Sequence, residues 1–141
     1  MTTTTTTTTK NSTDPAHADA VRRLVSGINA KDVSVMDELF ADDAVMHWPQ
    51  SGERVVGAAN RRAVYGAFPS LPTVTPRRIL ERGDLVVLEA TFDYGGGPGS
   101  VFEGVLLFEF SGGLIARETA YWAASFEPAE WRAAWVEIDP R

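Results

Sequence analysis

The chain has 141 residues, of which 44% are hydrophobic; it carries a formal net charge of −6 and contains no cysteine. This length and apolar content predict one domain that buries its own core without disulfides or metal, and a chain without thiols has neither a thiol nucleophile nor a thiolate metal site. The acidic charge and the scattered arginines argue against a nucleic-acid partner, while the lack of a membrane-length apolar run or a signal-peptide core predicts a cytoplasmic protein with no membrane partner.

The first thirteen residues, with threonine at positions 2–9, have almost nothing to bury, so residues 1–13 are expected to form a disordered tail. Residues 14–141 are expected to form the single domain, a short C-terminal helix included. Asp14 followed by Pro15 is typical of a helix start. Helical spacing of the apolar residues then predicts a first helix that extends to about Ala30.

A second, shorter helix is expected next, with an apolar stripe of Met36, Leu39 and Phe40. Asp32 is in the right place to cap its first turn, because a carboxylate accepts hydrogen bonds from the unpaired amides at a helix start.

Asp42 and Asp43 are expected to cap or end this second helix. A short strand is predicted over residues 44–48, where it is closed by a proline. A polar turn over residues 50–54 follows, and residues 58–68 suit a third helix that two further prolines break.

From Val74 onward the pattern changes to β. Apolar and β-branched runs are separated by turn formers at residues 83–84, 95–99 and 111–113. These breaks are too short for crossover helices, so the runs predict an antiparallel meander of about four strands, and the fold class is α+β with the helices first.

Two further segments carry more apolar side chains than a simple layer needs. Residues 101–110 are apolar on both strand faces, which predicts either a curled sheet around a cavity or a dimer contact. Residues 128–136 read as a short helix with Trp131 and Trp135 one turn apart, expected to cover the barrel or to join a dimer seam.

Three motifs in order along the chain resemble a known family: A-D-D-A-V-M-H-W-P before and within the first strand, G-E-R-V-V-G before the third helix, and R-E-T-A-Y-W in the last strand. From about residue 15 to residue 125 the chain resembles the nuclear transport factor 2 superfamily (NTF2-like), in particular its SnoaL-like members. The resemblance implies a cone-shaped, curved antiparallel β-sheet wrapped around N-terminal helices, the cystatin-like α+β barrel, and a homodimer.

The resemblance to ketosteroid isomerases does not extend to their catalytic residues. Counted without gaps from the shared motifs, the isomerase base, tyrosine and acid fall near Trp48, Leu24 and Leu106, none of which can transfer a proton. An epoxide-hydrolase arrangement would need the adjacent Arg117 and Glu118, which point to opposite faces of a regular strand. The SnoaL-like cyclases place an acidic residue on the last strand, and Glu118 is the acidic residue that matches it.

Glu118 is also a candidate on its own pattern. Strict alternation places it between Ala116 and Ala120, on the same strand face as Trp122. A carboxyl that enters an apolar cone loses solvation, so its pKa rises toward the range in which it can accept and donate a proton near neutral pH. The alternative is a strand glutamate that pairs with an arginine or faces solvent.

His47 is the second catalytic candidate, because its unperturbed pKa allows it to act as a general base or to hydrogen-bond a ligand carbonyl. The alternative is a half-buried strand histidine bonded to the backbone, since alternation places Trp48 rather than His47 on the cavity face.

The expected ligand-binding residues are mostly apolar, with one phenol that can donate a hydrogen bond. They are Trp48, Trp122, Met46, Leu24, Leu106 and Tyr121. No metal site and no cofactor are expected, because two histidines thirty residues apart lack ligand spacing and no phosphate or dinucleotide loop is present.

Three functions remain open from the sequence. The first is a cofactor-independent isomerase, cyclase or lyase acting on a small carbonyl compound, with Glu118 as acid or base. The second is a non-catalytic binding protein for an apolar small-molecule ligand, and the third is a dimeric association module.

Overall fold

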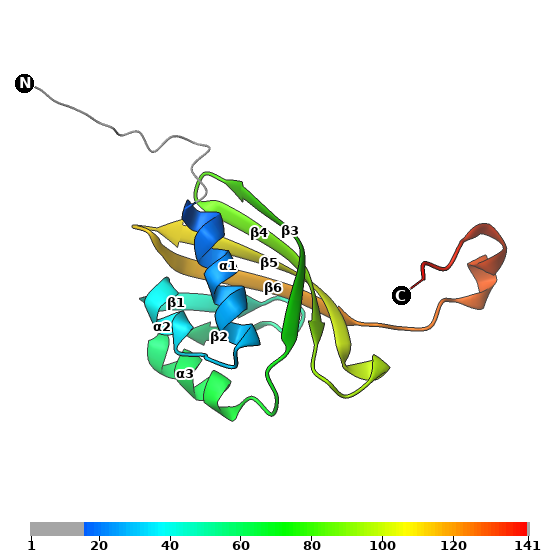
Figure 1. Ribbon diagram of the computed structural model, residues 1–141, viewed down its shortest axis with the longest axis horizontal. Helices are drawn as coiled ribbons and strands as arrows, with labels where there is room; N and C mark the ends of the chain where they lie inside the picture. The colour runs from blue at the N-terminus through cyan, green and yellow to red at the C-terminus, as the bar shows by residue number, and fades with distance from the viewer. Residues whose placement is uncertain (1–15, 141) are drawn as a thin grey trace, which may run out of the picture.

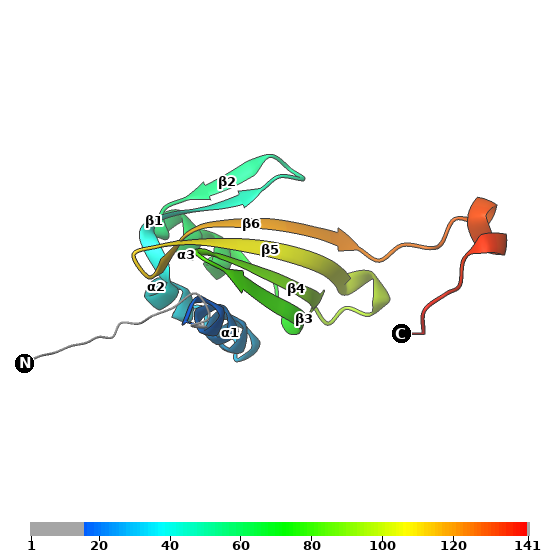
Figure 2. The same cartoon turned by 90° about the horizontal axis from the view of Figure 1, so that it is seen from above.

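A single curved, unclosed sheet of six strands carries the helices on its concave side (Figure 1, Figure 2). The computed structural model describes residues 16–140. The helices and strands are α1 (Ala16–Asn29), α2 (Val35–Leu39), β1 (Phe40–Trp48), β2 (Glu53–Val56), α3 (Ala58–Ala67), β3 (Thr73–Arg82), β4 (Leu85–Asp93), β5 (Val101–Ser111) and β6 (Leu114–Ala124), with short 3₁₀ helices η2 (Pro98–Ser100) and η3 (Glu130–Trp135). The expected α+β class and NTF2-like cone are confirmed.

The strand order in the sheet is β2-β1-β6-β5-β4-β3. Neighbouring strands are antiparallel except for β1 and β6, which run parallel. The predicted four-strand meander is therefore β3 to β6, joined by short turns, and the N-terminal strand pair is added at the β6 edge.

Helix α1 packs on the sheet through the stripe that its sequence predicted. Its buried residues include Val21, Leu24 and Ile28, which lie in the main core with side chains from β4 and β5. Asn29 fixes the end of α1 to β3, because its side-chain amide donates to the carbonyl of Val74 at 2.9 Å and accepts from the Val74 amide at 2.7 Å. The expected tail and the Asp14–Pro15 helix start lie outside the described residues.

The first strand differs from the prediction. It begins at Phe40, not at residue 44, so Asp42 and Asp43 are exposed strand residues rather than the end of α2. The predicted polar turn at 50–54 is shorter, because residues 53–56 form β2 and pair with β1. Asp32 does receive hydrogen bonds from the Ser34 amide and hydroxyl just before α2.

Strand β5 has two different faces. Phe108 and Phe110 are buried in the core on its inner side, whereas Val105 is partly exposed on the outer side. On that outer side Arg77 of β3 forms an ion pair with Glu103, and Arg78 donates to Glu89 at 2.7 Å. We call this convex surface of the sheet the outer face; the space that the sheet curls around lies on the other side.

Residues 126–140 form an arm that leaves the end of β6 and projects away from the body (Figure 1, Figure 2). The predicted helix over 128–136 is the 3₁₀ helix η3 within this arm. Trp131 and Trp135 are 75% and 80% exposed, so η3 does not cover the cone in this chain. Among the described residues, no helix is both long and apolar enough to cross a membrane.

Candidate functional site

Two adjoining cavities, of about 170 and 90 Å³, lie between the concave side of the sheet and the helices. The side chains that line both of them are Tyr65, Phe68, Phe92, Tyr94, Leu106 and Glu118. The lining is therefore aromatic and aliphatic apart from two phenols and one carboxyl, which is the usual composition of a site for a small, mostly apolar ligand.

Glu118 extends into this space from β6, and it is only 4% exposed. Burial raises the pKa of its carboxyl to about 7, and the positive charge of Arg61 partly offsets the rise. None of the described residues 16–140 donates a hydrogen bond to this carboxyl. It is thus free to exchange a proton with a molecule in the cavity.

A bulge in β6 lets Ile115 and Glu118 both point inward. Glu109 of β5 is opposite Arg117, but the next residue, Phe110, is opposite Ile115, so Ala116 is an extra residue without a partner. Because of this extra residue, Ile115 and Glu118 are both buried although they are three positions apart. A regular strand would place them on opposite faces.

The neighbours of Glu118 on its strand are thus partly as predicted. Ala120 is buried and lines the larger cavity together with Trp122. Ala116 was expected on the same face as a small neighbour, but that expectation is wrong in detail, because it is the bulged residue. The room around Glu118 comes from Ala120 and from the gap beside the helices.

Arg61 of α3 is a second buried charge, and the sequence analysis missed it. The residue is 2% exposed, and its Nη2 donates to Asp37 Oδ1 at 3.2 Å. Its guanidinium carbon lies 5.0 Å from the centre of the Phe40 ring. Its Nε and Nη1 have no hydrogen-bond partner among the described residues.

Tyr65 stands one helical turn after Arg61 on α3 and lines both cavities. Burial and the nearby Glu118 carboxyl raise the pKa of its phenol well above the usual value, so the hydroxyl stays protonated and can act as a donor. Burial also raises the pKa of the Tyr94 phenol, which lines the same space. The sequence signal for Tyr65 was its inward spacing on α3, which by itself indicates only a core residue. Tyr94 follows the end of β4 beside the glycine-rich turn, where the sequence suggests a solvated residue.

Trp48 and Trp122 form one wall of the larger cavity. Their rings meet edge to face, 5.8 Å between centres. The backbone amide of Trp122 donates to Gln50 Oε1 at 2.7 Å, which ties the end of β6 to the turn after β1. Phe92 also lines this cavity, and its ring packs against Gly104. A Cβ added at Gly104 would be only 2.6 Å from Cε1 of the Phe92 ring.

The structure does not bring His47 to this cavity. Its Nδ1 lies 3.3 Å from Nη2 of Arg117, and it pairs in register with Thr119 on the outer face. Tyr121 is likewise on the outer face, opposite Val105. Both side chains therefore lie on the other side of the sheet from Glu118.

The remaining predicted lining residues divide between cavity and core. Leu106 lines both cavities and Leu24 lines the smaller one. Met46 is fully buried in the main core and lines neither cavity. Within the described part of the chain, no group of three or more His, Asp or Glu side chains is arranged to hold a metal ion.

A curved α+β sheet with the N-terminal helices on its concave side is the fold of the NTF2-like class of proteins. The model of the SnoaL-like domain matches residues 21–118, and the chain belongs to this family. No match was found among curated proteins.

Solved structures agree with this assignment. An NTF-2 like protein of unknown function from Burkholderia xenovorans is 29% identical, with 92% of this chain and 100% of that chain covered and a TM-score of 0.78. A putative ketosteroid isomerase from Kribbella flavida is 25% identical, with 89% and 91% covered and a TM-score of 0.78. A putative polyketide cyclase from Sinorhizobium meliloti is also 25% identical, with 73% and 94% covered and a TM-score of 0.64.

The similarity to the Burkholderia structure extends beyond the end of β6 into the arm. Residues 1–125 make up only about 89% of this chain. Because 92% of the chain is covered by the Burkholderia structure, the similarity extends into residues 126–141. A counterpart of at least part of the arm is therefore present in a related protein.

Proposed function

We propose that this protein binds a small, mostly apolar carbonyl compound in the cone and catalyses a cofactor-independent proton transfer on it, with Glu118 as the acid and base. Isomerisation, cyclisation and elimination are all reactions of this kind. The observation that carries the proposal is a carboxyl buried in an apolar cavity, with a pKa raised to about 7 by burial and with no hydrogen-bond donor among residues 16–140.

The ionised carboxylate removes a proton from the carbon next to the carbonyl, and the electron pair of that C–H bond moves to form an enolate. The protonated carboxyl then returns the proton at another atom, so the enzyme ends in its starting state. A pKa near the working pH suits both steps, because neither the acid nor the base form is then scarce.

Tyr65 is the donor that we assign to the developing enolate oxygen. Its phenol is protonated and lines the same two cavities as Glu118. A donor in a water-poor cavity stabilises a growing negative charge more strongly than it would in water. Tyr94, the residue just after β4, also lines the cavity and can donate to a second oxygen of the ligand.

The lining supports an apolar substrate with few polar groups. Trp48, Trp122 and Phe102 offer flat aromatic surface at the larger cavity, while Leu106 lies deeper. The two cavities together hold a small molecule rather than a long chain, because their volumes lie at or below the lower end of the range for drug-sized ligands.

The descriptions of two similar structures, a putative ketosteroid isomerase and a putative polyketide cyclase, name reactions of this class. The base of this chain differs from the isomerase arrangement, since Trp48 stands near the place of that base and the acid lies on β6 instead. His47 has no role in the proposed mechanism, because it lies on the outer face beside Arg117.

The test is exchange of carbon-bound hydrogen for deuterium in a panel of small cyclic ketones and 1,3-dicarbonyl compounds, followed by NMR in D₂O. We expect Glu118→Gln to lower the exchange rate of an active compound by about 100-fold or more and Tyr65→Phe to lower it by about 10- to 100-fold. Glu109→Gln is the matched control, because Glu109 is an exposed glutamate of the adjacent strand. Full exchange by Glu118→Gln would exclude the mechanism.

A non-catalytic binding protein is the second candidate. It is favoured by the small number of polar groups in the lining, which leaves little to orient a reacting bond. A compound extracted with the purified protein, bound by Glu118→Gln as tightly as by the wild type and returned unchanged after long incubation, would favour binding over catalysis.

A further inference from the structure

The larger cavity of the cone opens to solvent through a groove of about 370 Å³, which we call the mouth. The side chains that line the mouth are mostly aromatic; they are those of Phe68, Pro69, Ser70, Tyr94, Phe102 and Trp122. Four of the six also line the larger cavity, so the mouth leads directly to Glu118. Exposed apolar surfaces of this kind mark places where another group binds.

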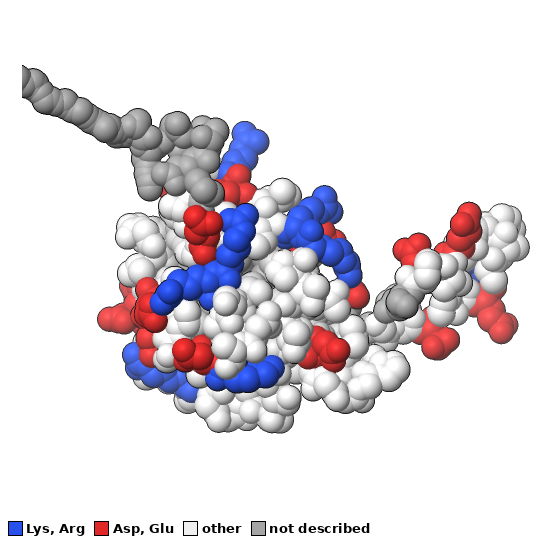
Figure 3. Space-filling model, in the orientation of Figure 1, with Lys and Arg blue, Asp and Glu red and all other residues white. Residues whose placement is uncertain are grey.

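The arm offers apolar side chains that could bind there. Phe126 is 77% exposed, Trp131 and Trp135 are 75% and 80% exposed, and Ile138 is 69% exposed. The space-filling view shows the arm standing away from the body, with uncharged and acidic atoms on it (Figure 3). Mouth and arm are therefore two apolar surfaces of one chain that both face water.

The arm begins at the mouth. Trp122 lies two residues before the end of β6, and the amide of Ser125 donates to the carbonyl of Val101 at 3.3 Å, next to Phe102 of the mouth. Alternation along β6 places Phe126, two residues past its end, on the same strand face as Trp122. The first aromatic side chain of the arm thus starts at the rim of the mouth.

The linker before η3 is long enough to bring the rest of the arm over the mouth. Residues 125–129 lie in neither a helix nor a strand, and five extended residues span at most about 17 Å. Figures 1 and 2 show the arm leaving the sheet at the end of β6 as a single extended connection. A rotation in this linker changes the side of the sheet on which η3 lies without moving any strand.

No bond holds the arm in its observed position. Within the part of the chain that the structure describes, no hydrogen bond, ion pair or ring contact joins the arm to the residues before it. Asp139 shares an open space of about 970 Å³ with Glu103, where Arg77 is already paired with Glu103 and Glu89. The acidic arm therefore gains no ion pair on the outer face.

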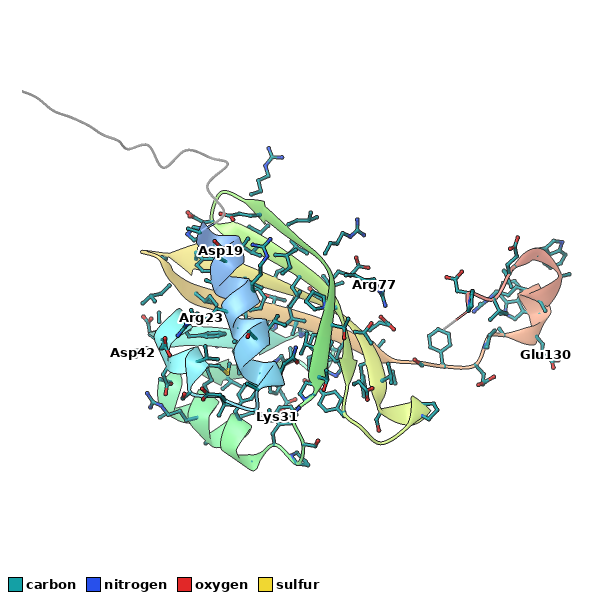
Figure 4. The ribbon with its side chains drawn as sticks, in the orientation of Figure 1. Asp19, Arg23, Lys31, Asp42, Arg77 and Glu130 are labelled. Carbon is teal, nitrogen blue, oxygen red and sulfur yellow. The ribbon has the colours of Figure 1, made fainter. Side chains whose placement is uncertain are left out.

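The loop at the mouth, residues 68–72, carries a cation that suits the arm better. Lys31 donates to the carbonyls of Leu71 at 3.0 Å and Pro72 at 3.3 Å, and it forms no ion pair with another described residue. Figure 4 shows Lys31 at the end of α1, near this loop, and Glu130 on the arm. The arm carries four carboxylates, Glu127, Glu130, Glu137 and Asp139, against one cation, Arg132.

We propose that the arm folds over the mouth of its own cone, where Phe126 and Trp131 complete the apolar wall of the ligand site and the carboxylates of the arm lie near Lys31. The inference rests on the proposed function in that the space covered is the proposed ligand site. In the observed position of the arm the mouth is open, as entry of a ligand requires. In the closed position water is excluded from the cavity, which strengthens the electrostatic interactions of Glu118 with a bound molecule.

The test measures the position of the arm in the full-length protein by NMR. Ala133→Cys provides the attachment site for a nitroxide spin label, because the chain contains no cysteine and Ala133 is exposed in η3. The label enhances the relaxation of nearby backbone amides. We expect the enhancement at Ser70 and Leu71, in the loop at the mouth, to exceed that at Arg77 and Thr91, beside the observed position of the arm.

Two sets of variants identify the contacts. Phe126→Ser with Trp131→Ser should lower the enhancement at Ser70 by about tenfold or more, because it removes the apolar contacts. Lys31→Glu should lower it by about twofold to fivefold, and the further changes Glu127→Lys and Glu130→Lys should restore it. Arg82→Glu is the charge-matched control without effect, since Arg82 lies at the other end of β3 from the mouth. The ¹⁵N spectrum of each variant verifies that it is folded.

Either of two results would overturn the proposal. Enhancement at Arg77 and Thr91 without enhancement at Ser70 would show that the arm stays on the outer side of the sheet. Equal enhancement at Ser70 in a mixture of spin-labelled protein with ¹⁵N-labelled protein that carries no spin label would show that the arm covers another copy. Glu118→Gln should keep the wild-type pattern, so a failed deuterium-exchange assay with Ser70 still enhanced contradicts the proposed function alone.

Discussion

Replacement of Glu118 by glutamine keeps the size of the side chain but removes the buried carboxyl, so it isolates the effect of that group on stability. Burial raises the pKa of Glu118 from its ordinary value of 4.5 to about 7. The native protein then binds this proton more tightly than the unfolded chain does. The stability that this difference contributes is complete below pH 4.5 and is lost as the pH rises to about 7.

The magnitude follows from the two pKa values. Each pKa unit corresponds to about 1.4 kcal/mol, so the wild type should lose about 3 kcal/mol of unfolding free energy from this group between pH 4.5 and pH 8. Glu118→Gln should not show this loss. The stability of the variant relative to that of the wild type should therefore increase as the pH rises through this window.

Urea unfolding of both proteins at half-unit intervals from pH 4.5 to 8 measures the difference directly, because the contributions of all other groups cancel. Glu109→Gln, at an exposed position on β5, is the control for the loss of a carboxylate outside the cavity. Parallel stability curves for the wild type and Glu118→Gln would refute the reasoning, since they would show that folding does not raise the pKa of the Glu118 carboxyl.

Two further substitutions test the surroundings of the carboxyl. Gly104→Ala should push the Phe92 ring toward the cavity and weaken ligand binding, and it should cost about 1–3 kcal/mol of stability by urea unfolding. Gly66→Ala is the control, because a Cβ added there meets nothing within 4 Å. This variant should not weaken ligand binding, and since Gly66 lies in a helix, the change should be neutral or stabilising. Arg61→Met removes the cation that lowers the pKa of Glu118. The midpoint of the Glu118 titration, measured by carboxyl ¹³C NMR, should therefore move to higher pH. A midpoint that does not rise would contradict this electrostatic interaction.

The parts of the fold that were predicted correctly are those whose pattern is local. The stripe of α1 and the turns between β3 and β6 each depend on neighbours within a few residues, so their periodicity and turn formers identify them. The start of β1 at Phe40 and the whole of β2 were missed. Strand β1 pairs in parallel with β6, about 70 residues further along the chain, and no local signal encodes that pairing.

The site shows the same division. Glu118 was identified from its position on the last strand, and it shares the cavity with Ala120 and Trp122; alternation does not reveal the bulge at Ala116, which places Ile115 on the same side. Arg61 reads in sequence as half of a surface arginine pair, and only the packing of α3 against α2 and β1 buries it. His47 was proposed as a general base from its residue type alone. It lies on the outer face of β1, where its side chain is beside Arg117.

Arg61 and Glu118 are the only charged side chains that are fully buried among the described residues, and they have opposite signs. A pair that served stability alone would be expected to form a direct hydrogen-bonded ion pair, because an unpaired buried charge is costly. Instead Arg61 bonds to Asp37, and no described residue donates to the Glu118 carboxyl, which lines the cavity. The arrangement lets the cation limit the rise in the pKa of Glu118 while leaving its oxygens open to a ligand, and that is the condition a proton-transfer site requires.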